Sequence, residues 1–159
     1  GVTISGTVGA AMEAAAMGIP ALAISLETDT QYHLTHSEEV DFSTAGYFTA
    51  YFALLLLEKK FPSEVNLIKV EVPSHATPET KWEVGGLSHN RYYDPFPAKR
   101  ASWDVPGPIL YKHSEGIDHE PEDTDVHILR TKKKVAVTPL NLDMTARIKF
   151  TEFEDFLRK

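Results

Sequence analysis

The stretch that decides the fold reads Ser5-Gly6-Thr7-Val8-Gly9-Ala10-Ala11-Met12-Glu13-Ala14-Ala15-Ala16-Met17, and continues Gly18-Ile19-Pro20-Ala21-Leu22-Ala23-Ile24-Ser25-Leu26. Alanine has the highest helix propensity, so the first part predicts a helix that Ser5 or Thr7 can cap. Gly18 followed by Pro20 is a helix stop signal. The apolar run from Ala21 to Leu26 is typical of a strand buried on both faces of a parallel sheet. A helix followed by such a strand predicts a doubly wound α/β fold.

The rest of the chain adds further elements to this pattern. Helices are predicted from Asp41 or Ser43 to about Lys59 and from Thr151 to Lys159, and strands at Val65–Val72, Asp125–Arg130 and Val135–Pro139. The region from Pro73 to Pro121 is rich in proline and shows no helical period, which predicts irregular structure with β-hairpins. We therefore expect one domain, with an α/β core portion at 1–73, a β-rich arm at 74–130, and a returning strand and C-terminal tail at 131–159.

Composition narrows the class of protein. The chain has 159 residues, of which 42% are apolar and 25% charged, as in ordinary globular proteins. Its net charge of -7 disfavours general binding to a nucleic-acid duplex or an anionic membrane, because phosphates repel it. It has no cysteine, which excludes disulfides and thiolate nucleophiles. The longest apolar stretch, Ala45 to Leu57, is shorter than the roughly 20 residues that span a bilayer. We expect a cytoplasmic protein.

The turn from Ser5 to Gly9 is a candidate phosphate site. The first N–H groups of a helix lack partners and are partly positive because of the helix dipole. Two hydroxyls and two glycines let the backbone approach an anion closely. The same residues also suit an ordinary helix cap in a tightly packed helix, and on spacing alone that interpretation is favoured.

Three ordered stretches resemble the SurE family of survival proteins. The first comprises residues 5–13 and 18–25, quoted above. The second is Thr138-Pro139-Leu140-Asn141-Leu142-Asp143-Met144-Thr145, where the family shows Thr-Pro-Leu, Asp and Thr. The third, looser match consists of Val72-Pro73, Arg91-Tyr92-Tyr93 and Asp123-Thr124-Asp125-Val126. The stretches lie in the family's order, and the resemblance covers essentially the whole chain.

The resemblance implies a Rossmann-like α/β/α sheet core with a β-hairpin arm and a C-terminal helical tail. It implies a metal-dependent phosphatase that hydrolyses nucleoside 5'- or 3'-monophosphates, in which Ser5, Gly6 and Thr7 contact the phosphate. It also implies a homo-oligomer, a dimer or a tetramer, formed by exchange of the arm and the tail.

The family's cofactor is a divalent cation, Mg or Mn. An N-terminal Asp-Asp-Gly motif and a Ser and an Asn from two later loops hold it, and none of these ligands is present in this sequence. The chain opens at Gly1 without methionine, so we expect a fragment, a trimmed chain or a processed piece. We assign no nucleophile, general base or metal ligand, and we expect this chain alone to hydrolyse no nucleotide. The competing hypothesis is a non-catalytic structural or interaction module.

Other clusters allow two interpretations each. His33 and His36 could share a helical face, but no third metal ligand is near. An acidic cluster could imitate a hard-cation site but lacks the spacing of a calcium loop, so a solvated surface cluster is favoured; it comprises Asp118, His119, Glu122, Asp123, Asp125 and His127. Aromatic residues of the arm could form a subunit interface or pack within hairpins; they are Tyr92, Tyr93, Phe96 and Trp103. Asp143 and Arg147 have the spacing of a helical ion pair.

Overall fold

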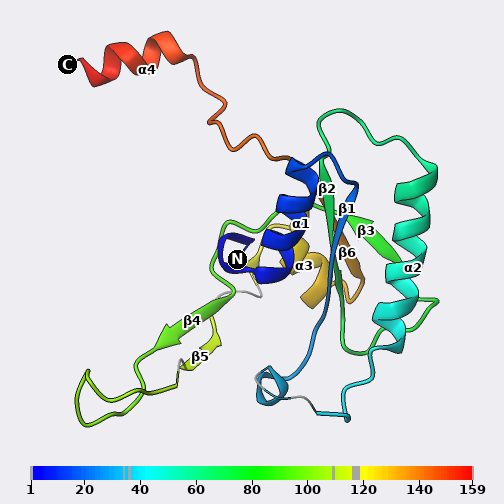
Figure 1. Ribbon diagram of the computed structural model, residues 1–159, viewed down its shortest axis with the longest axis vertical. Helices are drawn as coiled ribbons and strands as arrows, with labels where there is room; N and C mark the ends of the chain where they lie inside the picture. Colours follow the sequence, from blue (N-terminus) through cyan, green and yellow to red (C-terminus); the bar gives the residue numbers. More distant parts are fainter. Residues whose placement is uncertain (1, 34, 36, 109, 116–118, 159) are drawn as a thin grey trace.

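A mixed sheet with helices on both faces forms the body of the molecule (Figure 1). The computed structural model describes residues 2–33, 35, 37–108, 110–115 and 119–158. In chain order its elements are η1 (Val2–Ile4), α1 (Gly6–Ala16), β1 (Ala21–Leu26), η2 (Thr30–Tyr32), α2 (Ser43–Glu58), β2 (Leu67–Val72), β3 (Trp82–Val84), β4 (Tyr93–Phe96), β5 (Leu110–His113), α3 (Asp125–Arg130), β6 (Val135–Leu140) and α4 (Phe150–Leu157). The α/β class predicted from the sequence is confirmed.

The central sheet has the strand order β1-β2-β6-β3. Strands β1 and β2 are parallel, as predicted, and β3 is parallel to β6, whereas β2 and β6 are antiparallel. The helix α2 connects β1 to β2, because parallel neighbours need a crossover. The carboxyl ends of β1 and β2 therefore lie at the same edge of the sheet.

The two faces of β2 differ in chemistry. Ile68, Val70 and Val72 belong to the core beneath α2, whose Phe48 and Phe52 cover them. Side chains alternate between faces along a strand, so the other face carries Leu67, Lys69 and Glu71. Leu67 packs in the core beneath α1 with Val8 and Ala11. This second face is therefore apolar at the start of β2 and charged towards its carboxyl end.

The ends of α1 are those that the sequence predicts. Ser5 has extended backbone angles, and its hydroxyl accepts a hydrogen bond of 3.2 Å from the Val8 N–H. At the other end Gly18 has a positive φ of 77°, which glycine adopts without strain. The N–H of Gly18 donates to Ala15 and that of Ile19 to Ala14, which is the Schellman pattern that terminates helices. These bonds orient α1 so that its first turn lies at the sheet's carboxyl edge.

The predicted strand at Asp125–Arg130 is wrong, because these residues form the helix α3. The Thr124 hydroxyl caps this helix by accepting a hydrogen bond from the His127 N–H. Val126, Ile128 and Leu129 are buried, and their near-alternation in the sequence resembles a strand. Packing of these side chains against the sheet requires a helical turn here.

The predicted arm at 74–130 also divides differently. Strand β3 belongs to the central sheet and α3 to its covering layer, while β4 and β5 form a separate antiparallel hairpin. This hairpin and the tail helix α4 both extend away from the body (Figure 1). Phe150, Phe153 and Phe156 of α4 are exposed. Among the described residues, no helix has the length and apolarity needed to cross a membrane.

Candidate functional site

A cavity of about 370 Å³ lies at the carboxyl ends of β1 and β2. Its lining includes Ser5 at the start of α1, Ser25 and Glu27 at the end of β1, and the pair Lys69 and Glu71 on β2. Residues of the loop before β4 and of α3 close the remaining side. In open α/β sheets, ligands bind beyond the carboxyl ends of the strands, so the fold marks this cavity as the candidate site.

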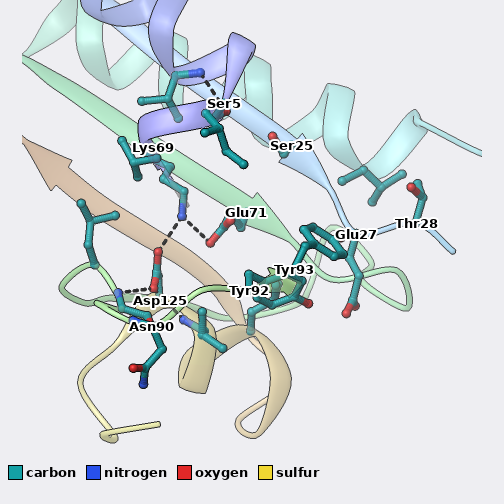
Figure 2. Close-up of a pocket in the computed structure, with 18 of the residues that line it drawn as sticks. Ser5, Ser25, Glu27, Thr28, Lys69, Glu71, Asn90, Tyr92, Tyr93 and Asp125 are labelled. Carbon is teal, nitrogen blue, oxygen red and sulfur yellow. Dashed lines mark hydrogen bonds and ion pairs between the residues drawn. The ribbon is translucent and has the colours of Figure 1, made fainter. Parts of the chain in front are cut away.

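The buried ammonium group of Lys69 lies at the centre of the cavity. Figure 2 shows the Lys69 ammonium between the carboxylates of Glu71 and Asp125. Its Nζ is 2.6 Å from Glu71 Oε2 and 2.6 Å from Asp125 Oδ2. The side chains of Lys69 and Asp125 are only 11% and 6% exposed, so water screens this pair little. Lys69 and Glu71 were not predicted as site residues from the sequence. The signal available there was that both follow Leu67 on the same face of a predicted strand.

Asp125 also fixes the loop that closes the cavity. Its Oδ1 accepts hydrogen bonds of 2.8 Å from the N–H of Ser88 and from that of Val126. The Asp125 N–H donates in turn to the Gly86 carbonyl at 2.8 Å. Asp125 therefore joins the first turn of α3, the loop at 86–88 and the Lys69 ammonium.

Glu71 differs from Asp125 in its surroundings. Lys69 is its hydrogen-bond partner through Oε2, and no second partner is found among the described residues. Burial raises the pKa of Glu71, and the Lys69 ammonium partly offsets this effect. Glu71 therefore lies at the cavity surface as a carboxyl group whose charged form is disfavoured by burial and supported by Lys69.

Aromatic rings form the wall beyond Glu71 (Figure 2). The rings of Tyr92 and Tyr93 lie edge to face with centroids 4.8 Å apart, and both line the cavity. Burial raises the pKa of Tyr93 to about 12, so its hydroxyl stays protonated at neutral pH. His33 lies in the same wall, and its Nδ1 is 2.8 Å from the Tyr111 hydroxyl. His36, its proposed companion, lies outside the described residues.

Of the three predicted phosphate contacts, one lines the cavity and two lie outside its lining. Ser5 lines the cavity, and its hydroxyl is engaged as the cap of α1. Gly6 and Thr7 form the exposed first turn and do not line the cavity. A Cβ added at Gly6 would meet no atom within 4 Å, so space is available beside this turn.

The predicted acidic surface cluster is only partly correct. His119, Glu122 and Asp123 are exposed, but Asp125 is buried in the ion pair with Lys69. Asp118 lies outside the described residues. Within the described ranges, no group of three or more His, Asp or Glu side chains could hold a metal ion. Glu71 and Asp125 already share an ammonium, so these residues do not fit a divalent cation by themselves.

The remaining predicted residues lie away from the cavity. Arg147 and Asp143 form an exposed ion pair of 3.3 Å, although this segment is not helical. Trp103 is 80% exposed, with the Arg100 guanidinium 4.1 Å from its ring centroid. Phe96 is 44% exposed. The interface role of these aromatics stays a prediction.

A comparison with protein families gives a match to the family described as survival protein SurE, over residues 1–94. The chain belongs to the SurE family. The resemblance inferred from the three sequence stretches is therefore confirmed. The matched range includes the cavity residues on α1, β1, β2 and β4, such as Ser5, Ser25, Lys69 and Tyr93, but not those on α3.

Curated SurE relatives match nearly the whole of this chain. A protein named 5'-nucleotidase SurE from Thermococcus kodakarensis is 39% identical over 98% of this chain and 60% of its own length. Its namesake from Methanocella arvoryzae is 36% identical over 99% of this chain and 59% of its own length. The chain thus spans about 60% of the length of these relatives.

Among solved structures, the SurE protein from Aquifex aeolicus has the same fold. Its TM-score is 0.69 at 25% sequence identity, covering 99% of this chain and 59% of that one. The Rossmann-like arrangement that the sequence predicts agrees with this neighbour.

Proposed function

We propose that this chain supplies the phosphate-binding turn and the nucleoside-facing wall of a 5'-nucleotidase, a phosphatase that hydrolyses nucleoside 5'- or 3'-monophosphates. The observation that carries the proposal is the start of α1 at the edge of a cavity with one aromatic wall. The names of the relatives, which match nearly all of this chain, support the same activity.

The phosphate is proposed to bind at the first turn of α1. The Ser5 hydroxyl satisfies the Val8 N–H, so the N–H groups of Gly6 and Thr7 are the ones left for an anion. The Thr7 hydroxyl is exposed on this turn and can add a hydrogen bond. The nucleoside would then extend into the cavity towards Tyr92 and Tyr93.

A divalent cation, Mg or Mn, is the proposed cofactor, and it would stabilise charge on the phosphate oxygens. Because the described residues do not fit such a cation by themselves, its ligands are proposed to come from elsewhere in the complete protein. This chain alone would then be inactive, and we propose that the complete protein acts in the cytoplasm. The alternative, a non-catalytic interaction module, predicts no turnover in any form.

Oligomerisation is proposed to involve the arm and the tail. The hairpin of β4 and β5 and the helix α4 extend from the body, and α4 exposes three phenylalanines along its length. Exposed apolar surface of this kind marks contact sites between proteins. A homodimer or tetramer that exchanges these segments would cover it.

The test is phosphate release from adenosine monophosphate by the full-length protein with Mn, with this chain alone as a comparison. Thr7→Val should weaken inhibition by inorganic phosphate by about 1–3 kcal/mol, as for a lost hydrogen bond to a charged group. Thr77→Val, in an exposed loop outside the cavity lining, is the matched control. Gly6→Ala should act in the same direction, because its methyl group meets no protein atom but lies at the proposed phosphate. Unchanged inhibition in both variants would contradict the proposed phosphate site.

A further inference from the structure

A second groove, of about 320 Å³, lies between α2 and the edge strand β3 and shares no lining residue with the cavity. Three aromatic residues dominate its lining, Tyr47 and Tyr51 of α2 and Trp82 of β3. Between 37% and 46% of each of these residues is exposed. Large rings that are exposed together beside an unpaired sheet edge mark a contact site. The groove is therefore a candidate docking surface.

Buried rings hold this aromatic surface in place. The Tyr47 ring lies edge to face with Phe48 at a centroid distance of 5.2 Å, and the Tyr51 ring with Phe52 at 5.0 Å. Trp82 also lies against Phe52, with centroids 6.0 Å apart. The two tyrosine hydroxyls and the indole N–H have no hydrogen-bond partner among the described residues. The groove thus offers well-supported rings with hydrogen-bond donors at their ends.

Such a surface is suited to a segment in the polyproline II conformation. That conformation has no internal hydrogen bonds, so its carbonyls can accept bonds from tyrosine and tryptophan, and its prolines dock on aromatic rings. Tyr47 and Tyr51 are one helical turn apart on α2, which corresponds to a rise of about 6 Å. Two prolines separated by one residue in polyproline II are also about 6 Å apart. The spacing of the rings therefore matches a Pro-x-Pro sequence.

The tip of the β4–β5 hairpin carries a segment with this pattern. Its sequence is Asp104-Val105-Pro106-Gly107-Pro108, and all of it is exposed. Val105 and Gly107 each precede a proline, which disfavours helical backbone angles and favours polyproline II. Asp104 and the groove residue Lys81 have opposite charges, and neither forms an ion pair within the described part of the chain. The hairpin and α2 lie on opposite sides of the body, so the groove receives the segment of another copy (Figure 1).

We infer that the groove between α2 and β3 binds the hairpin tip of a second copy of this chain. Pro106 and Pro108 dock on the two tyrosine rings of α2, and Asp104 lies beside Lys81. The inference rests on the proposed exchange of arms between subunits and deepens it, since it names the surface that receives the arm. If each hairpin docks on the other chain, the contact is reciprocal and closes a dimer.

The experiment is light scattering of the full-length protein over a concentration series. Pro106→Ala/Pro108→Ala and Tyr51→Ser should each raise the dissociation constant for assembly by about tenfold, as expected for contacts at the centre of an interface. Pro97→Ala changes an exposed proline of the same hairpin, and Leu57→Ser an exposed residue of α2 outside the groove. These two controls should leave the dissociation constant unchanged.

Charge reversal tests the same contact without removing a ring or a proline. Lys81→Glu and Asp104→Lys should each weaken assembly by about fivefold, and the variant with both changes should restore it, because the two charges meet between copies. A monomeric native protein, an unchanged dissociation constant in the proline and tyrosine variants, or no restoration in the double variant would overturn the inference. Binding of a polyproline peptide to the intact oligomer would also overturn it, because the groove would then be open to a different protein.

Phosphate release from adenosine monophosphate by the same variants reports on the proposed phosphatase separately. The groove and the cavity have no lining residue in common, so the variants should keep the activity of the native protein. Assembly that responds as expected without any hydrolysis would refute the phosphatase and leave the docking site intact. Hydrolysis with unaltered assembly in every variant would refute the docking site alone.

Discussion

Replacing Lys69 by methionine tests how much the ion pairs of the cavity contribute to the free energy of unfolding. The methionine keeps a side chain of similar length and apolar stem but removes the ammonium. Two carboxylates lose their common partner, and the Asp125 side chain is only 6% exposed. Breaking a buried pair by removing one member costs about 3–5 kcal/mol, because it leaves an uncompensated charge.

The structure places the expected cost at the lower end of this range. Asp125 keeps the hydrogen bonds from the N–H groups of Ser88 and Val126 after the substitution, and these stabilise its charge. Glu71 can bind a proton, since burial already raises its pKa. We expect a loss of about 3 kcal/mol in the free energy of unfolding. For a chain of this size, that corresponds to a fall in Tm of roughly 6–12 °C.

Urea denaturation followed by circular dichroism measures this loss, with Lys149→Met as control. Lys149 pairs with Glu152 at 2.8 Å, but these side chains are 78% and 69% exposed. An exposed pair contributes under about 1 kcal/mol, so the control should change stability little. The double variant Lys69→Met/Asp125→Asn should recover part of the loss, because the more deeply buried of the two unpaired carboxylates is gone. Equal losses in Lys69→Met and the control would refute the argument.

Ser5→Ala removes the cap of α1 and should lower the free energy of unfolding by about 1 kcal/mol, measured by urea denaturation. Hydrogen bonds from Lys132 and Lys134 lower the pKa of Glu83 from 4.5 to about 2. This pairing therefore stabilises the fold above pH 4.5, and thermal melts of the native protein and Glu83→Gln should converge as the pH falls towards 2. Light scattering should show a dimer or tetramer of the full-length protein at micromolar concentration, and a monomer would contradict the exchange of arm and tail.

Local sequence signals predict the first half of the fold well. The cap at Ser5, the stop at Gly18 and the apolar run at Ala21–Leu26 each act within one or two turns, so the sequence alone defines these elements. The prediction of a strand at Asp125–Arg130 was wrong because contacts far apart in the sequence, and not local signals, determine this segment. Burial of Ile128 against the sheet, and not local propensity, decides its conformation.

The centre of the cavity could not be predicted in the same way. Lys69 and Asp125 lie 56 positions apart, and only the packing of α3 beside β2 brings them together. In the sequence, Lys69 and Glu71 are the polar members of a strand and suggest a face in water. The informative signal is the leucine two residues earlier on the same face, Leu67, which is fully buried in the structure. On this face of β2, the change from Leu67 to the paired charges of Lys69 and Glu71 marks the point beyond which α1 no longer covers the strand.

The same edge of the sheet explains how a substrate would be oriented in the proposed mode. The start of α1 is partly positive, and its N–H groups attract the phosphate. The cavity beside it has an excess of negative charge because Glu71 and Asp125 share Lys69. A nucleotide that entered in the reverse orientation would place its phosphate against Glu71 and its base against the helix start. Attraction at one end and repulsion at the other therefore favour one orientation, and they do so with few direct contacts to the base.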